Sequence, residues 1–402
     1  MRKKIVIVGG GIIGSSIACH LASQGLGGHV VVFEPDPTYA RSSTTRSASA
    51  LRMQFNLGIN VAMSRYGHEF FSNANAHLSL GHEFTDVKFE HCPYLVLSAP
   101  EGLSRMRLAH QRQLDNGGEI DLLVSAQEFE RVKWLKTDGL GAATLGRTGE
   151  GWLEPLPALQ ALRRKAESLG VAYIAERATG FDLQPGHIAG VEFGRDEYIE
   201  VETVINAAGA QAAQVAAMAS VPLPIEARKR SAFVFRSANP PVGFTNLVDP
   251  TFANRGIYAR PYHGDFLAVT SPAPEVDHHT DDMAADLSLF DDIVRPGLAR
   301  RVVGFEDIQL VDAWAGHYEI NTFDQNGIIG RHPEIHNFVL ACGFSGHGVM
   351  HAPAVGRGVS ELLTTGGYKT LDLTPFRFER IAQNMPLDDV QASEHRQTAA
   401  GV

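Results

Sequence analysis

The chain has 402 residues, more than a single hydrophobic core usually covers, so we expect two domains. Its net charge of -10 argues against a broad phosphate-binding surface and hence against nucleic acid as a partner. Three scattered cysteines form neither a disulfide framework nor a zinc-binding pattern. Since no apolar run has the length of a membrane span or of a signal peptide's central segment, we expect a cytoplasmic protein.

The first 34 residues predict a strand, a helix and a second strand. Residues 5–8 form an apolar, β-branched run, which is typical of a strand covered on both faces. Ile13, Ile17 and Leu21 then recur every four residues and mark the buried stripe of a helix. Residues 29–34 form the next apolar run, so the chain opens with a βαβ unit.

Helices and short strands continue through the middle of the chain. A strand is expected over 89–97 and a polar helix over 100–115, and Ser125 with Glu128 forms a capping box that predicts another helix. A further amphipathic helix ends at Gly170. Runs of β-branched and aromatic residues predict strands at 171–175, 188–193, 198–205, 231–235, 256–260 and 266–270.

A glycine-rich loop follows the first strand and matches the pattern G-x-G-x-x-G over residues 9–14. Gly9 permits the tight turn, Gly11 lets the backbone approach a pyrophosphate, and Gly14 lets the helix pack closely on the sheet. Glu34 ends the next strand 20 residues after Gly14, where a carboxylate accepts hydrogen bonds from a ribose diol and repels a 2′-phosphate. The loop therefore predicts a cofactor that contains ADP, which both FAD and NAD do.

Three later segments carry a resemblance to a known family. They are the strand and glycine of 203–210, the Trp-Ala-Gly of 314–316 with Asp-Gln-Asn-Gly-Ile-Ile-Gly of 324–330, and Gly-Phe-Ser-Gly-His-Gly of 343–348. In this order they resemble the D-amino acid oxidase/sarcosine oxidase superfamily of FAD enzymes. The tail is most similar to a subgroup of FAD-dependent oxidoreductase domain proteins whose mitochondrial members assist the assembly of respiratory complex I.

The resemblance implies an α/β fold in which a Rossmann-like FAD-binding domain carries an inserted α+β substrate domain built on an antiparallel sheet. The expected FAD-binding domain comprises 1–87, 151–225 and 321–385, the substrate-binding domain comprises 88–150 and 226–320, and 386–402 form a polar tail.

The resemblance also implies which residues hold FAD. Attachment is expected to be non-covalent, because 314–325 lacks cysteine and 41–52 lacks histidine. A helix beginning near residue 350, with Pro353 in its first turn, would stabilise negative charge on the reduced flavin. The expected FAD contacts are Gly9, Gly11, Ile12, Ile13, Gly14, Glu34, Ser43, Thr44, Thr45, Arg46, Ala208, Gly209, Gly343, Ser345, Gly346, His347, Gly348 and Val349.

Four residues are candidates for the substrate site. Arg52 lies where relatives carry an arginine that binds the substrate carboxylate, although a structural ion pair explains it equally well. Tyr258 and Arg260 alternate along a strand and face one side, where packing is the alternative for the tyrosine. His347 stands in the glycine turn, either as a hydrogen-bonding partner of flavin or substrate or as a structural histidine.

No metal site is expected. His347 and His351 have the spacing of a helical metal-binding pair, but the glycines between them argue against a helix at that point. The acidic and histidine-rich residues 277–282 are expected to form a solvated loop.

The function implied is oxidation of the C–N bond of a secondary amine or amino acid, of the sarcosine, dimethylglycine, D-amino acid or opine type, by hydride transfer to flavin N5. Oxygen or another electron acceptor would reoxidise the flavin. Met350 replaces a lysine of the sarcosine oxidases, and residues 266–269 lack the lysine that promotes reaction with oxygen, so oxidase and dehydrogenase both stay open. Other hypotheses are a flavoprotein with mainly an assembly role, a subunit of an opine-oxidising complex, and an NAD-dependent dehydrogenase that uses only the first glycine loop.

Overall fold

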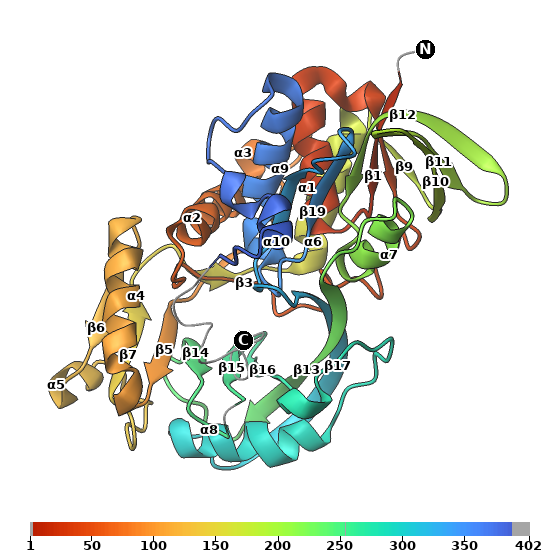
Figure 1. Cartoon of the computed structure of the whole chain (residues 1–402). Coiled ribbons are helices and arrows are strands. Elements are labelled where there is room, and N and C mark those ends of the chain that lie inside the picture. The colour runs from red at the N-terminus through yellow and green to blue at the C-terminus, as the bar shows by residue number, and fades with distance from the viewer. Residues whose placement is uncertain (1–2, 254, 388–402) are drawn as a thin grey trace.

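Two eight-stranded sheets dominate the computed structural model, which describes residues 3–253 and 255–387. Each sheet has its own helical cover, and the two lie one above the other in Figure 1. Residues 388–402, which make up most of the expected polar tail, lie outside the described residues. The mixed α/β class expected from the sequence is confirmed.

The first sheet is parallel at its centre, where β1 (Lys4–Val8) pairs with both β2 and β12. Ile5, Val6, Ile7 and Val8 are all buried, as the unbroken apolar run predicts. The other strands are β2 (Val30–Phe33), β9 (Ala172–Ile174), β10 (Ala178–Gln184), β11 (His187–Phe193), β12 (Glu197–Asn206), β18 (Ile328–Arg331) and β19 (Phe338–Cys342). Their order is β10-β11-β12-β1-β2-β9, and β19 joins β12 and β18.

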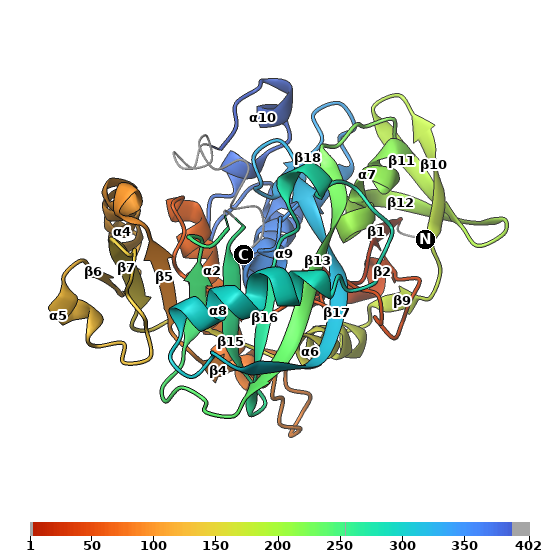
Figure 2. The same ribbon diagram turned by 90° about the horizontal axis from the view of Figure 1, so that it is seen from below.

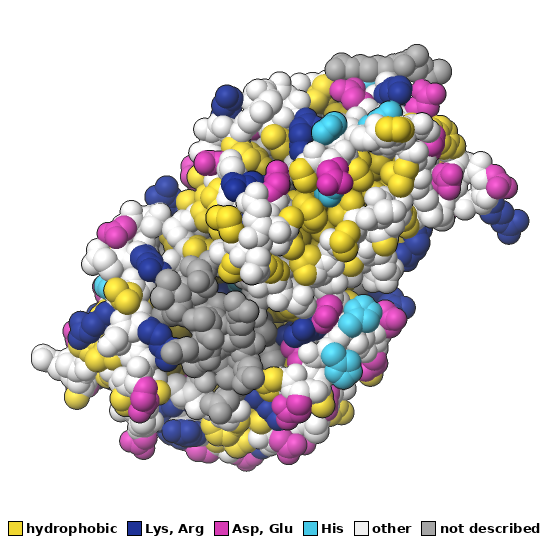
Figure 3. All heavy atoms as spheres, in the orientation of Figure 1, with side chains coloured by type: hydrophobic (Ala, Val, Ile, Leu, Met, Phe, Trp, Pro, Cys, Tyr) yellow, Lys and Arg dark blue, Asp and Glu magenta, His cyan; other side chains and the backbone are white. Residues whose placement is uncertain are grey.

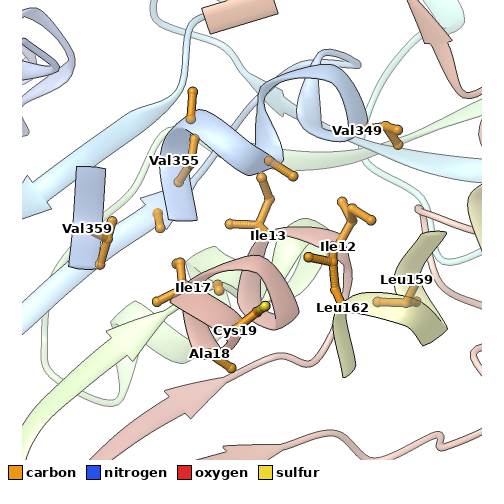
Figure 4. Close-up of a cluster of buried hydrophobic side chains, with 14 of the residues drawn as sticks. Ile12, Ile13, Ile17, Ala18, Cys19, Leu159, Leu162, Val349, Val355 and Val359 are labelled. Carbon is orange, nitrogen blue, oxygen red and sulfur yellow. The ribbon is translucent and has the colours of Figure 1, made fainter. Parts of the chain in front are cut away.

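Helix α1 (Ile12–Leu21) lies between two other helices, α6 (Pro155–Ser168) and α9 (Gly348–Thr365). Figure 4 shows Ile13 and Ile17 of α1 on the side of α9, while Leu159 and Leu162 of α6 lie beside Ile12. The glycine loop sets this packing, because a Cβ on Gly14 would lie 1.9 Å from the carbonyl oxygen of Gly9. Helices α2 (Gly58–Ser72) and α3 (Ala74–Leu78) complete this layer.

The second sheet is mainly antiparallel, and only the β5–β14 pair among its described pairings is parallel. Its order is β17-β13-β16-β15-β14-β5-β7-β6. These strands are β5 (Tyr94–Ser98), β6 (Ile120–Leu123), β7 (Ala142–Gly146), β13 (Ile225–Ser237), β14 (Asn246–Asp249), β15 (Ile257–Tyr262), β16 (Asp265–Thr270) and β17 (Ile308–Asn321).

The two faces of this second sheet have different partners. One face packs against apolar side chains between residues 289 and 298. Part of this segment belongs to α8 (Arg295–Arg301), which lies across the strands in Figure 2. The other face carries Tyr94, Tyr258 and Val269 and packs against Ala48 and Ala50, which lie at and just before β3. Helices α4 (Leu103–Asp115) and α5 (Ala126–Phe129) flank the β5–β7 end, and α5 has the predicted Ser125–Glu128 capping box.

The strand expected over 89–97 is divided. Residues 90–91 form β4 (Glu90–His91), which pairs with β8 (Gly151–Trp152) in a small sheet that also holds β3 (Ala50–Leu51), whereas β5 begins at Tyr94 in the large sheet. Pro93 stands between them and has no N–H for a ladder, which accounts for the break.

The prediction that Pro353 lies in the first turn of its helix is wrong. Pro353 is the sixth residue of α9, beyond its first turn, so the carbonyl of Val349 receives no helical N–H from it. Residues 277–282 form the expected loop, and four of its six residues are exposed. Asp277 is an exception, because both its oxygens accept from the buried Arg230, at 2.7 and 2.8 Å. Lys229, the residue before Arg230 on β13, pairs with the exposed Asp282 of the same loop.

No helix within residues 3–253 and 255–387 combines the length and the apolar character needed to cross a bilayer. Figure 3 shows basic and acidic side chains interspersed over the face that it displays.

The contact between α2 and α9 leads to a stability prediction. A Cβ on Gly67 would lie 2.0 Å from the carbonyl oxygen of Met350, so we expect Gly67→Ala to lower the free energy of unfolding by about 2 kcal/mol. Helix propensity alone favours alanine by about 1 kcal/mol, and the clash must overcome that gain. Urea denaturation measures the difference. Gly28→Ala is the control, since a Cβ there meets nothing within 4 Å and should leave stability almost unchanged.

Candidate active site

A cavity of about 580 Å³ extends along the first sheet from the glycine loop to the start of α9. The parallel strands and the turns before α1 and α9 bring together residues from seven separate segments of the chain, within 8–13, 33–47, 176–178, 207–218, 281–283, 317–319 and 346–349. Of the expected FAD contacts, those on its wall are Gly9, Gly11, Ile12, Ile13, Glu34, Ser43, Thr44, Ala208, Gly209, Gly346, Gly348 and Val349.

One end of this cavity is the N-terminus of α1. Gly9 has a φ of +103°, and a Cβ there would lie 2.3 Å from the carbonyl oxygen of Ala207, so only glycine fits. The hydroxyl of Thr44 accepts from the N–H of Ile12 at 3.2 Å, which orders one of the first amides of the helix. A helix N-terminus with close backbone approach is a ready-made site for a pyrophosphate.

Glu34 lies at the end of β2 on the cavity wall. Its two carboxylate oxygens accept from the N–H groups of Gly10 and Asp36, at 3.0 and 2.9 Å. Partial burial raises the pKa of Glu34, while these two hydrogen bonds oppose the rise. The carboxylate is thus fixed beside the glycine loop, where a ribose diol would donate to it.

The other end of the cavity is the N-terminus of α9. Gly346 has a φ of +93°, and the ring of Tyr318 on β17 would lie 2.5 Å from a Cβ there. The N–H of Gly343 donates to Glu319 Oε2 at 3.0 Å, and burial raises the pKa of Glu319 to about 7. Neither Tyr318 nor Glu319 was predicted, because the motif at 314–316 did not indicate a strand that continues to Asn321.

Several predicted FAD residues are placed behind the wall rather than on it. The hydroxyl of Thr45 donates to the carbonyl of Tyr39, and the guanidinium of Arg46 donates to the carbonyls of Ala40 and Ala315. Gly14 packs against Gly9, and Gly343 binds Glu319. They shape the cavity without lining it. Ser345 and His347 belong to a second cavity.

This second cavity, of about 50 Å³, adjoins the first. Ser47, Tyr318, Gly346 and Val349 line both of them. It receives Tyr94 and Tyr258 from the second sheet, Arg52 from the segment after β3, and His347 with Met350 from the start of α9. Arg52 is the only Lys, Arg, Asp or Glu among the described residues that line it. Three of the four predicted substrate residues (Arg52, Tyr258 and His347) therefore meet here.

Arg52 and His347 are in direct contact. Arg52 Nη2 lies 3.1 Å from His347 Nε2, and its guanidinium stacks on the ring of Phe55 at 4.7 Å. Since a guanidinium only donates, Nε2 must accept, and a neutral His347 carries its proton on Nδ1. Burial and the charge of Arg52 hold the pKa of His347 well below its usual value, so the ring is neutral near pH 7.

His347 caps α9 and His351 lies within it, although the glycines had argued against a helix there. The two rings have centroids 5.7 Å apart, and His351 contacts the hydroxyl of Ser64 at 3.1 Å. Burial lowers the pKa of His351 to about 3. Within the described residues no group of three or more His, Cys, Asp or Glu side chains has the arrangement of a metal site.

The tyrosines form the wall that faces Arg52. The Tyr258 hydroxyl donates to Asn246 Oδ1 at 2.9 Å, and the rings of Tyr94 and Tyr258 stack with centroids 5.8 Å apart. Burial raises the pKa of both phenols, so both are neutral near pH 7.

Arg260 is not brought into either cavity. Its guanidinium stacks over Trp152 at 4.1 Å and donates to the carbonyl of Ala48 at 3.1 and 3.2 Å. Because Ala48 lines the second cavity, Arg260 supports the wall from behind.

The sequence profile of the DAO family of FAD-dependent oxidoreductases matches residues 4–362, so the chain belongs to that family. Its cofactor is therefore FAD, and the glycine turns, the α1 N-terminus and Glu34 of the first cavity fit an ADP-containing group. Among relatives, FAD-dependent oxidoreductase domain-containing protein 1 of Xenopus laevis is 37% identical, covering 96% of this chain and 84% of the relative. Glycine oxidase of Bacillus licheniformis is 24% identical, covering 94% of this chain and 98% of the relative. The crystal structure of L-proline dehydrogenase from P. horikoshii superposes with a TM-score of 0.81 and 26% identity, covering 96% of this chain and 99% of that one.

Glu34 provides a test of the first cavity. We expect Glu34→Gln to weaken FAD binding about tenfold, or about 1.4 kcal/mol, because one amide oxygen replaces a charged acceptor of two N–H groups. Quenching of FAD fluorescence on titration of apoprotein measures the dissociation constant. Glu192→Gln is the matched control on the exposed part of β11 and should bind FAD as the wild type does.

Proposed function

We propose that this FAD-dependent oxidoreductase oxidises the C–N bond of a small amino acid or secondary amine whose carboxylate pairs with Arg52. The observation that carries the proposal is the second cavity, which shares four wall residues with the FAD cavity and contains one cationic side chain. The relatives named glycine oxidase and L-proline dehydrogenase are consistent with an amino acid substrate.

Each wall of the second cavity has a chemical role in this proposal. FAD, when bound, supplies the hydride acceptor at N5. Arg52 orients the substrate carboxylate through its planar fork, and the neutral His347 holds that fork in place. Tyr94, Tyr258 and Tyr318 exclude water. Desolvation by these rings favours the neutral amine over the ammonium ion, and a neutral amine is what hydride loss from the neighbouring carbon requires.

The size of the cavity favours compact substrates. A cavity must offer about 10–15 Å³ to hold one water molecule. The second cavity, of about 50 Å³, therefore accommodates only a few heavy atoms. This supports sarcosine, glycine or proline over the bulkier opines. A role as a subunit of an opine-oxidising complex would require the Tyr94 and Tyr258 wall to move.

We further propose that FAD is held non-covalently and that oxygen or another acceptor reoxidises it. In support, no cysteine lies on the described wall of the FAD cavity, and its one histidine, His317, contacts the carbonyl of Asp282 at 3.1 Å. A reducing compartment such as the cytoplasm is supported by Cys19, Cys92 and Cys342, which are buried and free.

The same proposal assigns the FAD-binding domain to 1–87, 151–225 and 321–385 and the substrate-binding domain to 88–150 and 226–320. The bounds of two strands support it: β13 begins at Ile225 and β17 ends at Asn321, where the chain would pass from one domain to the other. The FAD cavity also lies mainly along the first sheet, while Tyr94 and Tyr258 enter the second cavity from the second sheet.

An anaerobic visible spectrum tests the function. We expect flavin absorption that one of sarcosine, glycine, proline or D-alanine bleaches within seconds to minutes, since hydride transfer reduces the ring. Air would then restore the bands if oxygen is the acceptor. A yellow protein that no amine or amino acid bleaches would instead favour the assembly role, and pull-down of partner proteins would follow.

Arg52 tests the carboxylate assignment. We expect Arg52→Gln to lower kcat/KM for the bleaching substrate about 100- to 1,000-fold, as loss of a charge-assisted pair removes about 3–4 kcal/mol. Arg52→Lys keeps the charge without the fork and should fall between this variant and the wild type. Arg195→Gln on the exposed surface is the control. Equal activity of Arg52→Gln and wild type would contradict the assignment.

A further inference from the structure

Glu150 is a buried carboxylate that lines neither cavity. It lies just before β8, and its residue is 3% exposed. Oε1 accepts from the N–H of Met53 at 2.9 Å, and Oε2 accepts from the N–H of Tyr94 at 2.8 Å. The side-chain amide of Gln54 adds a longer contact to Oε2 at 3.4 Å.

These donors lie next to the residues that form the second cavity. Met53 follows Arg52 in the chain, and Tyr94 is itself a wall residue. The two donors come from different sheets. Met53 follows β3 of the small sheet, whereas Tyr94 is the first residue of β5 in the second large sheet. One carboxylate therefore ties together the segments that carry the guanidinium and the facing tyrosine.

The strand β7 leaves room for the Glu150 carboxylate at Gly146. A Cβ on Gly146 would lie 1.8 Å from Glu150 Oε2, so only glycine leaves room for it. Next to it, the Thr144 hydroxyl donates to Gln54 Oε1 at 2.6 Å and fixes the orientation of that amide. Such satisfied polar networks hold their members in a single arrangement.

We propose that Glu150 is a positioning residue for the carboxylate site, holding Arg52 and Tyr94 together and taking up one proton from solvent when an anionic substrate pairs with Arg52. This inference rests on the proposed function, because it requires a carboxylate ligand at Arg52.

The charge balance explains the proton. In the free site, ionised Glu150 and Arg52 attract each other. A substrate carboxylate on Arg52 adds a second negative charge in a space from which water is excluded, and like charges there favour the protonated form of one. Glu150 then becomes neutral while the substrate remains ionised.

The buried titratable groups near Glu150 that have shifted pKa values do not change charge near neutral pH. Burial raises the pKa of Cys92 to about 11 and that of Tyr94 well above its usual value. His347 and His351, beside Arg52, have lowered pKa values. β7 contributes only the uncharged Thr144 and Gly146, and the strand β4 contributes Glu90 and His91, which are both exposed.

The direction of the pH dependence follows. Burial, opposed by its hydrogen bonds and by Arg52, raises the pKa of Glu150 to about 7 in the free protein, and the bound anion raises it further. Below pH 7 the group is protonated in both states, so affinity is independent of pH. Above pH 7 binding requires proton uptake, so affinity falls, by at most tenfold per pH unit, until the pKa of the complex is passed.

The experiment uses the FAD-loaded full chain and acetate, which is ionised throughout the range. Titrations between pH 6 and 8.5, followed by the flavin spectrum, give the dissociation constant at each pH. We expect the wild-type affinity for acetate to fall above pH 7 and that of Glu150→Gln to be flat. Glu90→Gln, whose carboxyl lies exposed on β4, should keep the wild-type slope.

Calorimetry on the wild type keeps the test independent of how the variant folds. Acetate titrations at pH 8 in two buffers of different ionisation enthalpy count the protons taken up, and we expect a value approaching one at pH 8 and near zero at pH 6. Binding without proton uptake at pH 8, or an unchanged slope in Glu150→Gln, overturns the role of Glu150 and leaves the carboxylate site intact. Failure of acetate to bind at any pH overturns the carboxylate site and this inference with it.

Discussion

The approach of Gly14 to the carbonyl of Gly9 is the contact on which the rest of the site depends. With no side chain at Gly14, only three residues separate the end of β1 from the start of α1, and the N-terminal residues Ile12 and Ile13 of this helix line the FAD cavity. α1 then serves as the surface on which α9 packs, and Gly67 lets α2 approach α9 to the carbonyl of Met350. The start of α9 is thereby placed where the two cavities share Gly346 and Val349.

Local patterns predicted the elements that depend on local interactions. The apolar run of β1 and the capping box of α5 follow from residues a few positions apart, and the glycine loop with Glu34 follows from the fixed length of one βαβ unit. The C-terminal glycine turn was also predictable, because positive φ at Gly343 and Gly346 is a requirement that only glycine meets easily.

Long-range charge pairing and strand register were not predictable in this way. Residues 277–282 form the expected exposed loop, but nothing local reveals that Arg230, 47 residues earlier, supplies a buried partner for Asp277. Arg260 alternates with Tyr258 on one strand, but register alone could not place its guanidinium between Trp152 and the carbonyl of Ala48. Glu319 and Glu150 went unnoticed since a single acidic residue in sequence gives no sign that its neighbours will be backbone amides from distant strands.

Glu150 and Glu319 are both buried near the cavities, and burial raises the pKa of each to about 7. The glycine turns lie at the two ends of the FAD cavity, and Arg52 lines the adjoining cavity together with Tyr94, Tyr258 and Tyr318. A fixed negative charge close to either would weaken anion binding, whereas a carboxyl whose pKa burial raises to about 7 is neutralised by one proton at little free-energy cost. Backbone hydrogen bonds hold both carboxyls in place, so under our proposal Glu150 can take up a proton without moving the segments that carry Arg52 and Tyr94.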